Sequence, residues 1–158
     1  MKVATRLLTL LAIVGLAVFY SSCKPDEKDN RTTEEKQLDQ LKATWALVSA
    51  NDGTDRTADF ANLVLTIGGS FSQGGTYNYS FTGTRPNPSP WPASGTWKFG
   101  TDPLTQIIRD PGQDIEIDAT YEVTATSLEI TFVIPDNWVG GRTTSVSGTW
   151  TFTFAKQP

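Results

Sequence analysis

Residues 114–126 read DIEIDATYEVTAT, a stretch in which apolar and polar side chains alternate. A period of two residues places the two sets on opposite faces of a β-strand. We therefore expect a strand over residues 114–126, with its apolar face turned toward a core and its acidic face toward water. The apolar face comprises Ile115, Ile117, Ala119, Tyr121 and Val123, and the acidic face carries Asp114, Glu116, Asp118 and Glu122.

Seven further segments show the same alternation, and most of them are joined by short connections, which favour antiparallel neighbours. A single open sheet would leave every apolar face in water, whereas closure buries these faces and removes the unpaired edges. The pattern predicts an all-β domain folded as an eight-stranded antiparallel up-and-down barrel; a two-sheet β-sandwich is the alternative. The seven segments are residues 45–49, 63–67, 77–81, 97–99, 106–109, 128–134 and 146–154.

A short helix is expected before the first strand. Residues 32–35 read TTEE, which fits the capping box of a helix N-terminus, and Leu38 and Leu41 follow at helical spacing. The sequence thus predicts a helix over residues 33–42 that caps one end of the barrel. The barrel domain as a whole is predicted to span residues 33–158.

The composition restricts the chemistry open to the chain. Its 158 residues suffice for one domain and a targeting segment. The chain has no histidine and one cysteine, so it lacks the commonest general base and excludes an internal disulfide or a thiolate metal site. A net charge of −4 disfavours binding to nucleic acid. We expect no enzymatic activity, no metal, no cofactor and no nucleic-acid partner.

The acidic residues fit structural roles. Carboxylates spaced along one strand resemble the pair used in glycoside hydrolysis, but those of residues 114–122 share the face that points to water. We therefore expect them to keep the strand soluble. The other aspartates, Asp110 among them, neighbour Gly, Pro or Asn and are expected in turns.

Residues 1–22 have the features of a secretory signal peptide. Lys2 and Arg6 precede an apolar run over residues 7–20, which is shorter than the roughly 20 residues needed to span a bilayer. Cys23 stands directly after this segment. The segment resembles a bacterial lipoprotein signal, and that resemblance implies cleavage before Cys23 and lipidation of its side chain. The alternative is an ordinary signal peptide.

Residues 23–32 are expected to form a flexible tether, because so charged a stretch buries too little apolar surface to fold. Removal of residues 1–22 leaves 11 basic against 17 acidic residues, so lipid rather than charge would hold the mature chain to a membrane. Lys24 and the acids after it resemble the export signal of Bacteroidetes lipoproteins. We expect an outer-membrane lipoprotein exposed at the cell surface; a periplasm-facing anchor is the alternative.

Two loops are candidates for a recognition surface. Trp91 lies in a stretch with four prolines, residues 84–92, and Trp138 lies in a turn-rich stretch, residues 135–142. Up-and-down topology places both connections at the same end of the barrel. We expect Trp91 to fold down as a plug over the barrel mouth. The alternative is that the two indoles, with Arg85 and Arg142 beside them, form a platform for a glycan or another ring-shaped ligand.

The barrel interior is the second candidate site. Tyr77, Tyr79, Trp97 and Tyr121 are expected to face the lumen and to contact a small apolar ligand or glycan. An open lumen would favour small-molecule binding, whereas a filled lumen would favour recognition of a glycan or protein at the surface. The complete set expected in the lumen is Trp45, Leu65, Tyr77, Tyr79, Trp97, Ile117, Tyr121, Ile130, Phe132, Trp150 and Phe152.

A small residue, Thr and Trp recur at three predicted strand starts: residues 43–45, 95–97 and 148–150. With the helix, eight strands and lipoprotein signal, residues 42–47 and 91–97 make the domain resemble the lipocalin-like lipoproteins of Bacteroidetes. The resemblance covers residues 33–158 and implies a binding protein. Lipocalins carry Gly-x-Trp in the first strand and a late Arg packed on the Trp; Ala43 and Lys156 stand here instead.

The expected function is that of a lipid-anchored envelope binding module for a small apolar molecule or glycan. The alternative is a structural or adaptor surface lipoprotein with a packed core and a protein partner. The sequence carries no signal for an oligomeric state.

Overall fold

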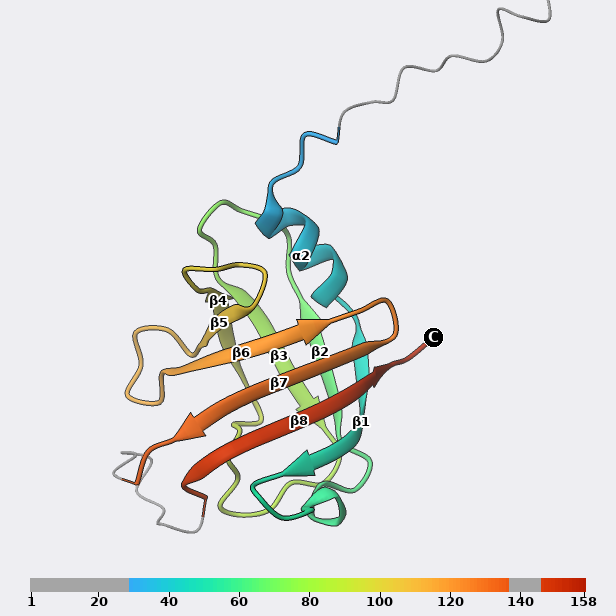
Figure 1. The fold of residues 1–158 in the computed structure, drawn as a ribbon, viewed down its shortest axis with the longest axis vertical. Coiled ribbons are helices and arrows are strands. Elements are labelled where there is room, and N and C mark those ends of the chain that lie inside the picture. The colour runs from blue at the N-terminus through green and yellow to red at the C-terminus, as the bar shows by residue number, and fades with distance from the viewer. Residues whose placement is uncertain (1–28, 137–145) are drawn as a thin grey trace, which may run out of the picture. The chain divides into compact units, whose positions relative to one another are not determined.

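The computed structural model describes residues 29–136 and 146–158, and the compact unit that carries the barrel spans Arg31–Pro158. Eight antiparallel strands close into a barrel in the order β1 to β8, each pairing with its neighbours in the chain (Figure 1). The strands are β1 Thr44–Asn51, β2 Val64–Gly68, β3 Tyr77–Thr82, β4 Ser94–Phe99, β5 Gln106–Arg109, β6 Ile117–Val123, β7 Ser127–Ile134 and β8 Gly148–Lys156; a short 3-10 helix, η2, covers Thr57–Phe60.

Pairing between the first and last strands closes the barrel. β1 and β8 run antiparallel, with Trp45 opposite Lys156 and Asn51 opposite Thr151, and the register shifts once between Leu47 and Ser49. The predicted eight-stranded antiparallel barrel is thereby confirmed, and the alternative of two packed sheets is wrong. Because the sheet closes on itself, each of its strands pairs with a neighbour on both sides, and the sheet has no free edge.

The predicted helix is present as α2 (Thr33–Leu41) and lies at one end of the barrel (Figure 1). The Thr32 hydroxyl accepts a hydrogen bond from the Glu35 backbone N–H at 3.1 Å, as the capping motif predicts. α2 ends one residue earlier than expected, and its carbonyl at Leu41 accepts the indole N–H of Trp45 at 2.9 Å. Leu38 and Leu41 are both buried, so the helix is joined to the barrel core.

The strand expected from residue 114 begins three residues later, at Ile117. Residues 110–116 form a turn in which Asp110 and Gly112 have φ values of 51° and 76°. The Glu116 carboxylate accepts a hydrogen bond from the Gly112 N–H, and the Glu116 N–H donates to the Gln113 carbonyl at 2.9 Å. These local bonds hold residues 114–116 out of the ladder. From Ile117 onward the predicted alternation of buried and exposed residues is confirmed. β8 likewise begins later than expected, at Gly148.

The barrel core is dense in aromatic side chains. Phe152 stacks with Phe132, Trp150 and Phe154 along one side of the interior, with ring centroids 5.8–6.2 Å apart. All eleven residues expected in the lumen are buried, each with a relative exposure of 5% or less. The described part of the chain contains no helix long and apolar enough to cross a membrane.

Candidate functional site

Trp91 lies inside the barrel and is only 4% exposed. Four rings surround its indole, with centroids 6.0 Å away at Tyr79, 5.2 Å at Phe81, 5.0 Å at Phe132 and 5.6 Å at Phe152. All four pairs meet edge to face, the arrangement that aromatic quadrupoles favour. The structure thus places Trp91 as the expected plug, and the alternative of an exposed platform at Trp91 is wrong.

The proline-rich connection between β3 and β4 holds this plug in place. Arg85, which is half-buried, donates a hydrogen bond to the Trp91 carbonyl at 2.9 Å, and Ser89 donates to the same oxygen at 2.9 Å. Arg109 donates to the Pro90 carbonyl at 3.1 Å. Arg85 therefore shapes the loop, and its guanidinium is engaged with backbone.

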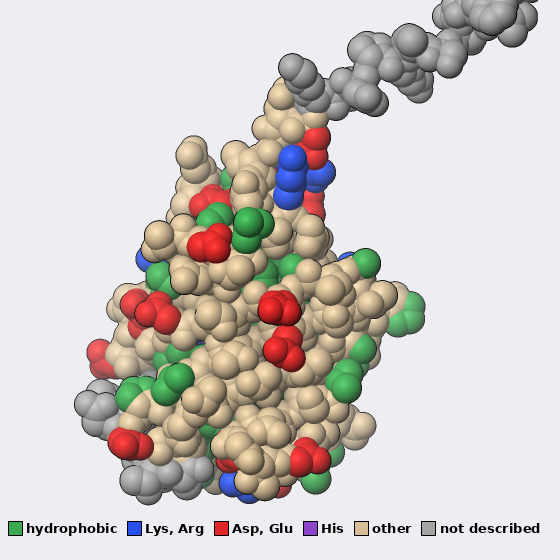
Figure 2. All heavy atoms as spheres, viewed as in Figure 1, with side chains coloured by type: hydrophobic (Ala, Val, Ile, Leu, Met, Phe, Trp, Pro, Cys, Tyr) green, Lys and Arg blue, Asp and Glu red, His purple; other side chains and the backbone are tan. Residues whose placement is uncertain are grey.

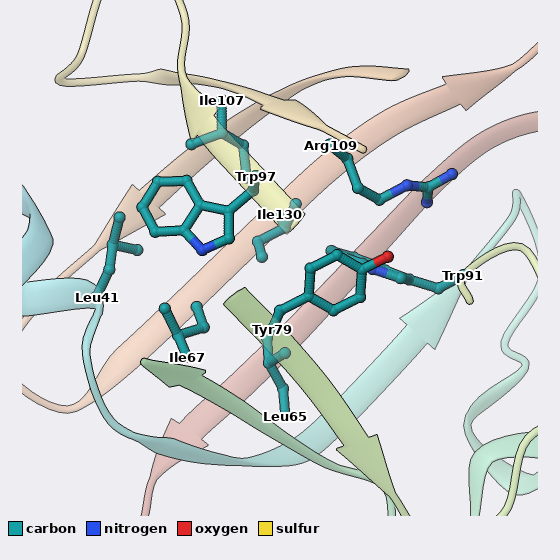
Figure 3. A pocket seen from close by; sticks show the side chains of 9 residues that line it. All are labelled: Leu41, Leu65, Ile67, Tyr79, Trp91, Trp97, Ile107, Arg109 and Ile130. Carbon is teal, nitrogen blue, oxygen red and sulfur yellow. The ribbon is translucent and has the colours of Figure 1, made fainter. Parts of the chain in front are cut away.

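A buried ion pair between Arg109 and Asp110 lies beside the plug, and Figure 3 shows its Arg109 side chain near Trp91 and Tyr79. Arg109 and Asp110 are each 1% exposed, and Arg109 Nε lies 3.4 Å from Asp110 Oδ2. The Arg109 guanidinium carbon also lies 5.4 Å from the Trp91 ring centroid and 5.0 Å from that of Phe132. Two ring faces and one carboxylate therefore surround a charge that is buried from bulk solvent.

Asp110 ties this pair to the sheet. Its carboxylate accepts from the Tyr79 hydroxyl at 2.9 Å and from the Thr96 N–H at 3.0 Å. A Cβ at Gly95 would lie 2.0 Å from Asp110 Oδ1, so only glycine admits the carboxylate here. Asp110 lies at a turn, as its sequence context predicts. Its side chain is in addition buried in the barrel, which the turn prediction did not include.

Burial determines the electrostatics of this cluster. It lowers the pKa of the Arg109 guanidinium, while the nearby Tyr79 and Asp110 act in the opposite direction. Burial also raises the pKa of Tyr79 well above its usual range, and the Asp110 carboxylate adds to that increase. Tyr79 is thus a permanent hydrogen-bond donor to Asp110 at physiological pH.

Tyr77 and Tyr121, which were also predicted to face the lumen, make different contacts. Tyr77 packs on Trp97 with ring centroids 4.9 Å apart and donates its hydroxyl proton to the Ser72 carbonyl at 3.1 Å. Tyr121 instead reaches the α2 end, where its hydroxyl bonds to Gln37 and to the Pro103 carbonyl. Burial raises the pKa of both tyrosines, and each hydroxyl already has a protein partner.

The lumen is nearly full. The cavity at its centre has a volume of about 20 Å³, which suits roughly one water molecule. Sites for small molecules typically need about 300–1,000 Å³. Of the predicted site residues, the structure brings Tyr79, Trp91 and Trp97 together around this cavity, whose lining is Leu41, Leu65, Ile67, Tyr79, Trp91, Trp97, Ile107, Arg109 and Ile130 (Figure 3).

Within the described part of the chain, four interior nitrogens have no hydrogen-bond partner: Trp91 Nε1, Trp97 Nε1, Arg109 Nε and Arg109 Nη2. Trp45 and Trp150 differ, since each donates its indole N–H at 2.9 Å to the carbonyl four residues earlier. At Trp97 the corresponding carbonyl, on Ala93, already accepts from the Phe81 N–H. The three segments with a small residue, Thr and Trp therefore each lie at the start of a strand, but their indoles do not share one hydrogen-bonding pattern.

A larger hollow lies on the outer wall of β5, β6 and β7. We call it the outer groove; its volume is about 660 Å³. Outward side chains form its floor in two rows. Gln106 pairs with Thr120 and Thr120 with Thr131 in the first row, and Ile108 pairs with Asp118 in the second. Because Ala119 pairs with Phe132, Asp118 lies between Ile108 and Val133, and Val133 is 56% exposed.

An adjoining hollow of about 130 Å³ extends the outer groove along β6 and β7. It shares Thr120 and Thr131 with the groove and adds Glu122 and Glu129, which stand directly opposite each other. Figure 2 shows acidic side chains near the centre of the face formed by these strands, with no basic side chain beside them. Four carboxylates, Glu116, Asp118, Glu122 and Glu129, thus line the two hollows.

Cys23, Trp138 and Arg142 lie outside the described residues, so their predicted roles stay predictions. The strand ends that lead into the connections with Trp91 and Trp138 do lie at the same end of the barrel, as expected from its topology. Among residues 29–136 and 146–158, no group of three or more His, Cys, Asp or Glu side chains is arranged to hold a metal ion.

Sequence reasoning missed the buried pair and the outer groove. Gln106–Arg109 forms a strand as predicted, and its alternation places Arg109 on the same side as the buried Ile107. That alternation was the available signal for an internal arginine. The groove had no such signal, since its rows combine outward residues of three strands.

Lys156 on β8 stands opposite Trp45 on β1. Its amine lies 5.7 Å from the ring centroid of Trp45, within the range of a cation–π contact. Comparison of the chain with models of known protein families, with curated protein sequences and with solved structures gives no match.

Proposed function

We propose that the chain is a lipid-anchored recognition module of the cell envelope that binds its partner on the outer wall of a packed barrel. The observation that carries this proposal is the contrast between a central cavity of about 20 Å³ and an outer groove of about 660 Å³. The groove falls within the usual size of a binding site, and the cavity does not.

Packing inside the barrel supports the outer mode. A small apolar ligand in the lumen would have to displace Trp91, which four rings and the Arg109 guanidinium surround. The outer groove requires no such rearrangement. We therefore place recognition of a protein or glycan partner ahead of small-molecule transport.

The lipocalin-like lipoproteins of Bacteroidetes are the family to which we propose that the chain belongs. The closed eight-stranded barrel, the preceding helix and the Lys156 contact on Trp45 support this assignment. We also propose that the chain is no enzyme, because the titratable cluster of Tyr79, Arg109 and Asp110 is buried beside a cavity too small for a substrate.

Membrane attachment is tested by the substitution Cys23→Ser in the full chain. If Cys23 is lipidated, the wild-type protein partitions into the detergent phase and C23S into the aqueous phase. Protease treatment of intact cells separates cell-surface display, which leaves the barrel accessible, from a periplasm-facing anchor. Retention of C23S in the detergent phase would refute the lipoprotein assignment.

The binding mode is tested by native mass spectrometry of the mature protein purified from envelopes of its host. We expect the mass of the lipidated chain alone once bound proteins and glycans are removed by salt and acid washes. A small molecule that stays bound until the protein unfolds would occupy the lumen, and would overturn the proposal of outer-wall recognition.

A further inference from the structure

We infer that the outer groove and its adjoining hollow bind an extended polypeptide segment that carries Lys or Arg residues four positions apart. This inference rests on the proposed outer-wall recognition and specifies its partner. It follows from the arrangement of charged and apolar side chains along β6 and its two neighbours.

The first position for a basic side chain is at Asp118. This carboxylate is exposed and stands between Ile108 on β5 and Val133 on β7. Lys and Arg combine an apolar stem with a cationic end. The stem would pack on Ile108 and Val133 while the cation pairs with the Asp118 carboxylate. A purely apolar group would leave the carboxylate unpaired, and a small charged group would leave the two apolar side chains uncovered.

The second position is at Glu122 and Glu129. Like charges directly opposite each other in neighbouring strands destabilise a sheet, and a cation placed between them removes that repulsion. Glu129 accepts a hydrogen bond from Thr153 at 3.3 Å, which leaves its charge uncompensated. Glu122 is four residues beyond Asp118, a separation of about 13 Å along a strand. An extended segment has the same rise, so basic residues at positions i and i+4 match the two sites.

These acids have no internal counter-ion within residues 29–136 and 146–158. The ion pairs found there use Asp39, Asp52, Asp59 and Asp110. Lys98 lies opposite Ile108 on the far side from Asp118 and pairs with none of the groove acids in this part of the chain. The charge of the groove therefore favours a cationic partner.

The row between the two acidic positions suits a polypeptide. Gln106, Thr120 and Thr131 provide hydroxyl and amide groups there. A glycan would favour an exposed aromatic ring to stack on, and the one aromatic residue of the groove lining, Phe132, is 2% exposed. Since the barrel has no free edge, recognition depends on these side chains and not on strand addition.

The test uses the isotope-labelled soluble C23S chain and three blocked peptides, followed by amide chemical shifts in NMR titrations. The first peptide, KVTVK, places two lysines and a threonine on one side of an extended chain. The second, KKVTV, has the same composition with adjacent lysines, and the third, EVTVE, reverses the charge. We expect KVTVK to shift the amides of β5, β6 and β7, KKVTV to bind more weakly and EVTVE not to bind.

Substitutions on the wall identify the groups involved. Asp118→Asn and Glu122→Gln are each expected to weaken KVTVK binding about two- to fivefold, as for a solvent-exposed ion pair. Asp114→Asn removes the same charge from the nearby turn, outside both hollows, and is expected to leave the affinity unchanged. The three side chains are exposed, so we expect the substitutions to leave the fold intact. A peptide-free spectrum that matches that of the parent protein checks this.

The inference would be overturned by equal binding of KVTVK and EVTVE, by an equal effect of D114N and D118N, or by no shift of the β5–β7 amides at about 5 mM KVTVK. An oligomer of N-acetylglucosamine that shifts these amides where KVTVK does not would also overturn it, and would leave outer-wall recognition intact. A small molecule retained in the lumen is the separate result that refutes the proposed function itself.

Discussion

The two faces of β5 place its four residues in opposite environments. Ile107 and Arg109 face the barrel interior, where the Arg109 charge is enclosed by Asp110, Trp91 and Phe132. Gln106 and Ile108 face the outer groove, where Asp118 and its neighbours have no counter-ion in the described part of the chain. The inner face of β5 thus surrounds a compensated charge, whereas its uncharged outer face lies beside carboxylates of β6 that have no counter-ion among the described residues.

The largest expected effect comes from opening the inner face. Trp91→Ala removes the plug from a closely packed site and should lower the free energy of unfolding by about 3–5 kcal/mol. Urea unfolding followed by circular dichroism measures this loss. Leu104→Ala, at a residue that is 53% exposed, is the control and should change stability by less than about 0.5 kcal/mol. Benzene should then raise the Tm of W91A, as in other ring-sized apolar cavities; equal losses for the two variants would contradict this account of the plug.

Breaking the buried ion pair should cost about 3 kcal/mol. Asp110→Asn keeps the shape of the side chain and tolerates the φ of 51°, but leaves Arg109 buried without an opposite charge. Thermal unfolding of D110N beside D114N, which loses an exposed carboxylate, checks the prediction. Adding Arg109→Met to D110N should recover part of the stability, because the uncompensated charge is then gone. A loss below about 1 kcal/mol for D110N would mean that the guanidinium is compensated by the rings alone.

Alkaline pH tests the Tyr79 hydroxyl. The folded state holds the pKa of Tyr79 above the value of about 10 expected in the unfolded chain. The stability this provides is complete below about pH 10 and is lost above it, by up to about 1.4 kcal/mol per pH unit, since the unfolded chain releases the proton first. In Tyr79→Phe, the free energy of unfolding should therefore fall less between about pH 10 and 11, by up to about 1.4 kcal/mol, than in the wild-type protein. Parallel curves for the two proteins would show that Tyr79 does not titrate on unfolding.

The smallest effects are expected on the outer face. Asp118→Asn should change the free energy of unfolding by less than about 0.5 kcal/mol. Glu122→Gln should change it by a similar amount toward greater stability, because Glu129 then loses a like-charged neighbour. Urea titrations at low salt, where surface charges are least screened, measure both values. A marked loss in either variant would show that these acids stabilise the fold, and would contradict the division between the inner and outer faces of the barrel wall.

The sequence predicted the barrel well because strand alternation is a local property. The same pattern failed at residues 114–116, where hydrogen bonds within the turn compete with the ladder and determine the start of β6. Arg109 was missed because a charged side chain is seldom buried in a core. Its ion-pair partner Asp110 is the next residue, but the groups that enclose it, Pro90, Trp91 and Phe132, come from a loop and another strand. For Trp91 the sequence left two alternatives open, an inward plug and an exposed platform, because the packing of the indole depends on the closed barrel.

The C-terminus leaves the barrel beside its first strand. The Gln157 N–H donates to the Thr44 carbonyl at 2.8 Å, and Thr44 follows α2 by three residues. A reporter fused after Pro158 would therefore emerge next to the point where the N-terminal segment enters the barrel, on the β1–β8 side of the wall. Labelled full-length protein could then be followed in living cells while the surface over β5, β6 and β7 stays uncovered.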